Sequence, residues 1–560
     1  MKRLLLSVLV FGLLTGCGKK AVEADAAPAP SSPTPPPTEA SDAAPGPDAG
    51  PSAADATAAD TAVDPNFRAT RPAASEPTPL TLPSITPFKL GNGLEVFLVP
   101  TALPTLSMTF EFDVGVIDDP DDALGLASAC LDLFSEGTER LDKVAWSEAL
   151  ADHAVSIYSP AGFETSTIVV RALASKLGPA LDLFAEMMNT PGLRQDDLSR
   201  ILDDRRAALA QSRGTPAGIA QRLLGAVVWG KDHPYGRIQQ MSHIDNITLD
   251  RCRALVTQLK PSGARLWVVG QVAREDLTRE LESRLATWTG EAPKRREVPP
   301  AATPNGRIHA VHVPGAVQSV IVVGYPGPAR AADDFEATSI MAQIFGGSFS
   351  SRVNMNLRED KGYAYGARGG FTYRRGGSHL SVSASVEVTT TALALAEVAK
   401  ETRIMRESPP KEEELVRERD GALQALPARF AKPSSTLDEL RTLHYFGLPL
   451  DWYSGHDKRL AALTVDAIHE AAKKHLPESQ LVVLVVGDLD QKEKAPAPAK
   501  PADPANPANP AAPNPPDAAD APPEAASGRT VREALKQLAD DKVFGDGGLV
   551  FLDADGEILP

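Results

Sequence analysis

The residues of this chain that could carry hydrolytic chemistry are its ten histidines and its serines. A metal centre needs several histidine or acidic side chains gathered around one point. His309 and His312 lie three apart on a predicted strand, so they should point to opposite faces. His469 and Glu470 are followed by Lys473 where a second histidine would be needed. No serine lies in the G-x-S-x-G pattern of a nucleophile elbow. These residues predict no self-contained hydrolytic centre.

Length and composition limit the classes of protein to consider. The 560 residues, 42% of them hydrophobic, allow two to four domains at about 100–200 residues each. A formal net charge of −16 provides no basic surface for nucleic acid, so we expect no nucleic-acid partner. The three cysteines are too few for a disulfide framework. No apolar run approaches the ~20 residues of a membrane-spanning helix.

The first residues are typical of a secretory signal. Met1-Lys2-Arg3 precede a largely apolar stretch that ends at Leu14, and Thr15-Gly16-Cys17 follow. The charged start and short apolar region predict a signal peptide over 1–16. Its ending resembles the lipobox of bacterial lipoproteins, in which Cys17 would be lipidated. Gly18 after the cysteine favours the outer membrane, facing the periplasm, over the inner membrane. An ordinary signal peptide with an incidental cysteine, or a short anchor, is the alternative.

Two further segments have compositions that cannot build a core. Residues 17–79 are mostly Ala, Pro, Asp, Ser and Thr, and residues 491–528 contain no Val, Ile, Leu or aromatic residue. Such segments bury too little apolar surface to offset their ordering entropy, so we expect both to be disordered. The first would tether the folded part to the membrane, and the second would be an insertion inside the second domain.

The remainder contains one pattern twice. Thr248 and Thr464 each open a helix signal that leads to a short apolar run, and the runs end at Gly270 and Gly487. The copies are therefore offset by 216 or 217 residues. In each copy a strand signal also leads into a helix signal, at 167–188 and 380–398. Duplication is the simplest account.

The order of these signals predicts an α+β fold with two homologous domains, each a mainly antiparallel sheet covered by helices. The predicted boundaries are 80–288 for the first domain, 289–306 for a proline-rich linker and 307–560 for the second domain. Residues 88–99 should form a hairpin around Asn92-Gly93. A helix over 530–539 and a strand and turn over 549–558 would complete the second domain.

Several short motifs together resemble the insulinase/pitrilysin family of zinc peptidases, in that family's order and spacing. They are Gly125-Leu126-Ala127, Gly137-Thr138, His233-Pro234-Tyr235-Gly236-Arg237, Gly346-Gly347-Ser348, Ser350-Ser351-Arg352, Leu357-Arg358-Glu359, Gly362 and Tyr365. The resemblance covers nearly all of 80–490. It implies the two-domain fold of that family and a structural role for His233.

The zinc motif of that family is absent here. The resemblance places an H-x-x-E-H helix directly after Gly-Leu-Ala, where the sequence reads Ser128-Ala129-Cys130-Leu131-Asp132. Ser128 and Asp132 replace the two histidines, and Leu131 replaces the glutamate that activates water. The third-ligand position falls near Ala207 or Ala208. Because leucine cannot accept a proton from water and no imidazole remains to hold zinc, we expect that this domain is not a zinc hydrolase.

Other potential donors near this helix are Cys130, Asp132, Asp203 and Asp204. We interpret them as a buried thiol and helix-surface acids rather than as a recruited metal site. No cofactor is therefore expected in this chain.

A second part of the family's site survives. The resemblance implies that an arginine and a tyrosine, spaced R-x6-Y, bind the substrate carbonyl and stabilise its oxyanion, and Arg358 and Tyr365 match that spacing. By analogy with oxyanion-hole donors, such a pair lowers the barrier by ~3–4 kcal/mol. The competing interpretation is a solvated turn residue and a strand residue packed in the core. Tyr363 would point the same way as Tyr365 only if the segment is extended.

Two functions fit a chain that has lost the zinc residues and kept this pair. In the first, the chain is the non-zinc subunit of a heterodimeric periplasmic peptidase, active only in the complex. It would supply Arg358 and Tyr365 to a homologous zinc-bearing partner that acts on peptides or unfolded proteins. In the second, the chain is a catalytically inert, lipid-anchored pseudopeptidase that serves as a scaffold or peptide-binding module.

Overall fold

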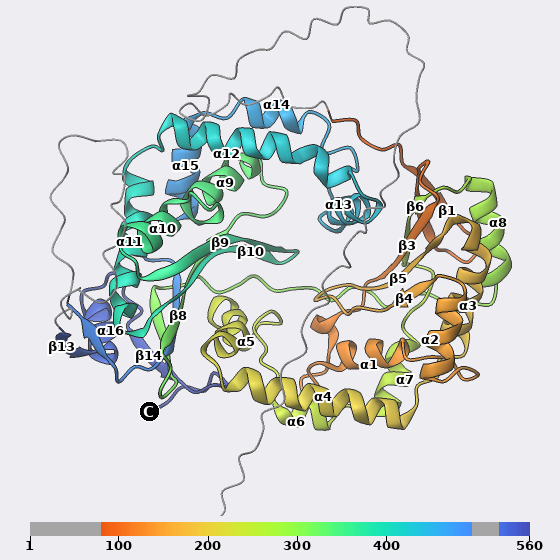
Figure 1. Cartoon of the computed structure of the whole chain (residues 1–560), viewed down its shortest axis with the longest axis horizontal. Coiled ribbons are helices and arrows are strands. Elements are labelled where there is room, and N and C mark those ends of the chain that lie inside the picture. The colour runs from red at the N-terminus through yellow and green to blue at the C-terminus, as the bar shows by residue number, and fades with distance from the viewer. Residues whose placement is uncertain (1–79, 496–525) are drawn as a thin grey trace, which may run out of the picture. The chain divides into compact units, whose positions relative to one another are not determined.

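The computed structural model describes residues 80–495 and 526–560. The signal, Cys17 and the tether predicted before residue 80 lie outside the described residues, as does most of the predicted insertion. Within the described ranges, no helix combines the length and the apolar character needed to cross a bilayer. The described residues form an α+β structure around two six-stranded sheets, as predicted (Figure 1).

The first sheet has the strand order β1-β2-β6-β3-β5-β4. The predicted hairpin is present, because β1 pairs antiparallel with β2 and Gly93 adopts φ +92°, a conformation that glycine tolerates without strain. β2 and β6 are parallel, whereas β3 is antiparallel to β6 and to β5. The strands are Thr86–Lys89 (β1), Glu95–Pro100 (β2), Thr105–Phe112 (β3), Ser156–Tyr158 (β4), Ser166–Leu173 (β5) and Arg265–Gly270 (β6).

The second sheet, ordered β14-β7-β11-β8-β10-β9, repeats this topology in five strands and differs at one edge, where β14 is parallel to β7 whereas β1 is antiparallel to β2. β7 and β11 are parallel, and β8 is antiparallel to β11 and β10. A short separate pair, β12 with β13, lies where the chain leaves and re-enters the described residues. The strands are Arg307–His312 (β7), Gln318–Gly327 (β8), Ala364–Arg374 (β9), Gly377–Glu387 (β10), Val482–Gly487 (β11), Lys492–Lys494 (β12), Ala526–Thr530 (β13) and Leu549–Leu552 (β14).

Helices fill the connections between these strands. The two repeated threonines act alike: the side chain of Thr248 accepts a hydrogen bond from the backbone of Arg251, and that of Thr464 accepts one from Ala467. In the first half the helices are Leu126–Phe134 (α1), Lys143–Asp152 (α2), Leu177–Asn189 (α3), Gln195–Arg213 (α4), Pro216–Trp229 (α5), Met241–Asp245 (α6), Leu249–Val256 (α7) and Arg274–Leu285 (α8). In the second half they are Phe335–Ala342 (α9), Arg352–Asn354 (α10), Thr391–Glu407 (α11), Glu412–Ala425 (α12), Pro433–Tyr445 (α13), His456–Ala461 (α14), Val465–His475 (α15) and Val531–Asp540 (α16).

Each sheet buries one face against helices of its own half. The first core draws its residues from 90–288, and includes the stacked rings of Phe110 and Phe184. The second core draws its residues from 308–544 and includes α16, which follows the segment that is not described. The chain therefore returns to the second sheet after that segment.

Two helices are exchanged between the halves. α5 belongs to the first half but packs Ile219 and Leu223 against Val322 and other residues of the second sheet. α13 belongs to the second half but packs Leu437 and Leu440 against Phe97 and Trp267 of the first sheet. Their first residues, Pro216 and Pro433, are 217 apart, which is the offset of the repeat. The opposite face of each sheet is thus covered by the same helix of the other copy (Figure 1).

Candidate functional site

The helix that occupies the place of the zinc motif is α1. Gly125 precedes it with φ +96°, and the Asp119 carboxylate accepts hydrogen bonds from the backbone N–H groups of Gly125 and Ala127 at 2.7 and 2.8 Å. These two bonds satisfy donors that the first turn of a helix leaves free. Burial nevertheless raises the pKa of Asp119 to about 6, although both hydrogen bonds oppose that rise. Asp119 is therefore a helix cap.

The residues at the former ligand positions make structural contacts. Leu131 is only 1% exposed and lies in the first core. The Asp132 carboxylate is ion-paired with the Arg205 guanidinium of α4. The Arg205 guanidinium is thus the positive group that faces α1 from α4. α1 itself contains no histidine. Asp203 and Asp204 pair with arginines of their own helix, as expected of surface acids.

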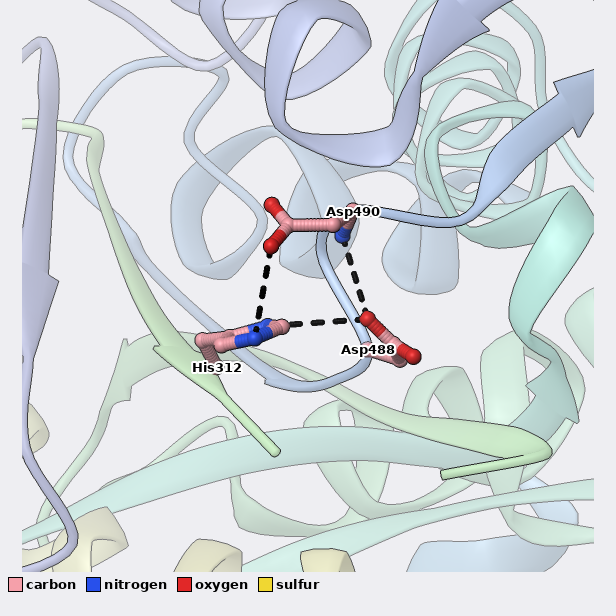
Figure 2. A group of neighbouring side chains, drawn as sticks. All are labelled: His312, Asp488 and Asp490. Atoms are coloured by element: carbon pink, nitrogen blue, oxygen red, sulfur yellow. Dashed lines mark hydrogen bonds and ion pairs between the residues drawn. The ribbon is translucent and has the colours of Figure 1, made fainter. Parts of the chain in front are cut away.

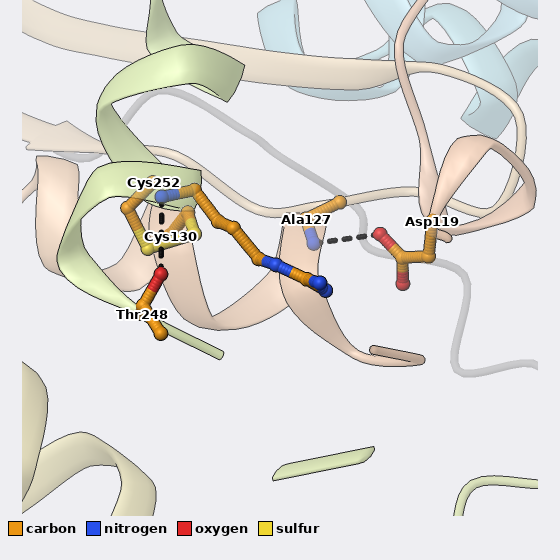
Figure 3. The surroundings of a disulfide bond; sticks show 6 residues. Asp119, Ala127, Cys130, Thr248 and Cys252 are labelled. Carbon is orange, nitrogen blue, oxygen red and sulfur yellow. Dashed lines mark hydrogen bonds between the residues drawn. A yellow bond between two sulfur atoms is a disulfide. The ribbon is translucent and has the colours of Figure 1, made fainter. Parts of the chain in front are cut away.

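Cys130 is not a free thiol, and the prediction of a buried thiol is wrong. Its sulfur is bonded to that of Cys252 on α7, which joins two helices 122 residues apart in sequence (Figure 3). Both cysteines are fully buried within the first core. The signal that could have found this bond is the pair of cysteines that remains once Cys17 is set aside, in a chain whose first residues predict a secretory signal.

The Arg358 side chain lies on the last helical turn before β9. Its guanidinium is 4.7 Å from the centre of the Phe349 ring, and its Nε is 3.2 Å from Glu359. Gly362, with φ +67°, then reverses the chain into β9. No hydrogen bond or ion pair joins these two described residues.

Tyr365 lies at a β-bulge. Ala367 pairs with Ala384, but the next pair is Ala364 with Val386, so Tyr365 and Gly366 of β9 face only one residue of β10. A bulge reverses the normal alternation of side chains and re-aims the extra residue. The ring of Tyr365 is 93% exposed. It is not a packed strand residue.

Tyr363 differs from Tyr365, because its side chain is half-buried against the second core. Asn354 links the segment that carries Phe349 to the start of β9. Its Nδ2 donates a hydrogen bond to the Phe349 carbonyl, and its Oδ1 accepts one from the backbone N–H of Ala367 at 2.8 Å. Asn354 is a positioning residue that the sequence analysis did not identify.

Two cavities meet at Tyr365. The first, of about 400 Å³, is bounded by Val317, Tyr363 and Glu387. The second, of about 620 Å³, lies between α5 and the faces of β8, β10 and β9. Arg358 lines neither of the two. The structure therefore places both predicted residues at the surface, but it does not bring them together around one cavity.

The described residues contain one trio with donors close enough for a metal ion: His312, Asp488 and Asp490, at the ends of β7 and β11 (Figure 2). Each member already has hydrogen-bond partners. The backbone N–H of Leu489 donates to Nδ1 of His312, and Arg532 donates to Asp490 at 3.0 and 3.1 Å. Because the Arg532 guanidinium already neutralises Asp490, we interpret this trio as a structural contact that joins the ends of β7 and β11.

Comparison with known proteins identifies the architecture. Residues 103–229 match the family model described as insulinase (peptidase family M16), and residues 246–421 match the one described as the peptidase M16 inactive domain. The two matches together cover more than half of the chain. The chain belongs to the M16 insulinase family.

Relatives of this M16 chain include proteins named as inactive and as proteases. A non-peptidase homolog of Helicobacter pylori, YmxG, is 21% identical over 367 residues, or 65% of this chain and 85% of that protein. A solved peptidase M16 inactive domain from Pseudomonas fluorescens has a TM-score of 0.66 at 23% identity, over 72% of this chain and 98% of that one. The periplasmic protease PqqL of Escherichia coli has a TM-score of 0.62 at 15% identity, over 74% and 46%. At these identities the solved structures establish the fold alone.

Within the M16 family this chain is therefore a peptidase-like homologue whose α1 lacks the zinc ligands. The turn from His233 to Arg237 is structural: His233 contacts the Pro299 carbonyl, and Arg237 donates to the carbonyls of Val116, Ile117 and Asp119. The other two predicted site residues, Arg358 and Tyr365, lie in the second half, just before β9 and within it.

Proposed function

We propose that this chain is the non-zinc subunit of a heterodimeric M16 peptidase, and that it supplies Arg358 and Tyr365 to a zinc-bearing partner. The observation that carries the proposal is the exposure of Tyr365. A phenol that is 93% exposed on a bulged edge strand stabilises no core, yet a bulge is a feature that re-aims side chains at functional sites. Arg358, half-buried over the exposed Phe349 ring, lies one turn before the same strand.

The proposed reaction is peptide hydrolysis on the partner's zinc. The partner would hold the metal and activate the water. In the proposed complex the Tyr365 hydroxyl and the Arg358 guanidinium donate hydrogen bonds to the peptide carbonyl oxygen as it gains negative charge. In the absence of the partner, Arg358 remains over Phe349, away from both cavities at Tyr365.

The proposed location is the periplasmic face of the outer membrane, with Cys17 as the lipidated residue. The Cys130–Cys252 disulfide supports a location outside the cytoplasm, because such bonds persist in oxidising compartments. Peptides or unfolded proteins in the periplasm would be the substrates.

The test is a reconstitution. The full chain, a candidate zinc-bearing M16 protein, and the mixture of both are assayed for cleavage of an unfolded reporter peptide. We expect cleavage only in the mixture, reduced roughly 10²-fold by Arg358→Ala or Tyr365→Phe. The matched control is Arg403→Ala, which removes an exposed arginine of α11 and should leave cleavage unchanged.

Complex formation must be measured on the same samples, by analytical ultracentrifugation. A partner that is fully active alone, or a mixture unaffected by both substitutions, would contradict the proposal. The chain would then be the inert pseudopeptidase, and the exposed tyrosine would have no part in cleavage.

A further inference from the structure

The cavity between α5 and the second sheet contains an arginine that the M16 motifs do not include. Arg368 lies on β9 and is the only charged residue among those that line the 620 Å³ cavity. In the described part of the chain it has no ion pair, hydrogen bond or ring contact, whereas Arg358 has both an ion pair and a ring contact. An exposed and unpaired cation in an otherwise uncharged cavity attracts anions.

The register of the sheet shows which groups surround Arg368. Arg368 pairs with Ser383 of β10, and Ser383 pairs with Val322 of β8, so all three side chains project from the same face. Ser381 and Ser385 flank Ser383 on that face, and no hydrogen bond engages any of the three hydroxyls within the described residues. The floor of the cavity therefore offers one cation and a row of hydroxyl donors.

The bulge adds Tyr365 to this face. In a regular strand, residues three apart point to opposite sides, so Tyr365 and Arg368 would be separated by the sheet. The extra residue at 365–366 cancels that alternation, and both side chains line the same cavity. The residue assigned to catalysis and the unpaired cation thus share one binding surface, with α5 as its opposite wall.

We infer that Arg368 and the serine row bind a carboxylate of the peptide substrate, seated between α5 and β9–β10 beside Tyr365. This inference rests on the proposed function, because it assumes that the ligand is a peptide. Charge complementarity selects the group: the guanidinium donates two parallel hydrogen bonds to a carboxylate, and the hydroxyls donate to its remaining lone pairs. The carboxylate can be an acidic side chain or the peptide's C-terminus.

The full chain is titrated by calorimetry with three short acetylated peptides of otherwise identical, uncharged sequence. One has a central Glu and an amidated C-terminus, one has Gln and an amidated C-terminus, and one has Gln and a free C-terminal carboxylate. We expect a peptide with a carboxylate to bind about tenfold more tightly than the neutral peptide. The two acidic peptides distinguish a side chain from a C-terminus as the source.

Arg368→Gln should abolish the preference, Arg368→Lys should retain most of it, and the matched variant Arg403→Gln on α11 should behave as wild type. Equal binding of all three peptides, or a preference that survives Arg368→Gln, would overturn the inference while the proposed function stands. Failure of every peptide to bind would count against both.

Discussion

At the scale of single residues, this chain has replaced catalytic groups by packing groups in one half and retained exposed groups in the other. Leu131 is buried where a water-activating glutamate would need access to solvent, and Asp132 is engaged by Arg205. That ion pair is more than half exposed at Asp132, so it adds at most about 1 kcal/mol to stability. The former ligand positions of α1 thus make packing and ion-pair contacts, whereas Tyr365 in the second half is 93% exposed.

Glu493 leads to a prediction about pH. Its Oε1 accepts a hydrogen bond from the backbone N–H of Ala392 at 2.7 Å, while its Oε2 is buried without a partner among the described residues. Burial raises the pKa of Glu493 to about 7, opposed by that hydrogen bond and by the charge of Arg529. The folded state therefore favours the protonated side chain.

Because the folded pKa lies above the unfolded one, this stabilisation is fully present below about pH 4.5 and is lost as pH rises through 7. Glu493→Gln keeps the acceptor and cannot ionise. We measure the free energy of unfolding of the variant and of wild type by urea titration at pH 5 and pH 8. We expect the advantage of the variant over wild type to be larger at pH 8 than at pH 5, by on the order of 2 kcal/mol. Glu470→Gln, an exposed glutamate on α15, is the control. Parallel pH profiles of wild type and Glu493→Gln would refute the prediction.

At the scale of elements, α1 is held in place by a cap, an ion pair and a disulfide. The disulfide closes a loop of more than a hundred residues, so its loss should cost about 2–5 kcal/mol. We expect Cys130→Ser with Cys252→Ser to lower the free energy of unfolding by that amount. Reductant should destabilise the wild type to the same level and leave the double variant unchanged. A wild type indifferent to reductant, with free thiols detected by mass spectrometry, would contradict the bond.

The elements that sequence reasoning predicted are those fixed by local chemistry. The Asn92-Gly93 turn and the Thr248 and Thr464 caps depend on neighbours a few residues away. The bulge at Tyr365 could not be predicted, because β9 contains three glycines and a glycine-rich strand does not define its own register. The disulfide depends on two helices meeting, and no local pattern encodes that contact.

At the scale of the whole described chain, the exchange of α5 and α13 makes each half depend on the other. An apolar helix face indicates burial but not the sheet that covers it, so the exchange could not be read from the sequence. Its consequence for function is direct. α5 forms one wall of the cavity that contains Tyr365 and Arg368, so a helix of the degenerate half shapes the proposed binding surface of the other half.

Asp555 secures α5 in this arrangement. Its carboxylate, in the turn after β14, pairs with Arg222 of α5 at 2.9 Å and with Arg213 of α4, and it is mostly buried. The nearby Glu557 pairs with Lys231 at the surface, where both side chains are largely exposed.

We expect Asp555→Asn to lower the free energy of unfolding by about 2–4 kcal/mol, because it leaves two guanidinium groups without their counter-charge, and that of Arg222 is mostly shielded from solvent. Glu557→Gln, which removes the same charge two residues later, should change it by less than about 1 kcal/mol. Both are measured by urea unfolding of the full chain. Hydrogen exchange should show faster exchange in α5 for Asp555→Asn alone. Equal effects of the two variants would mean that α5 is held by its apolar contacts with the second sheet, and that the turn after β14 adds nothing to the wall of the cavity.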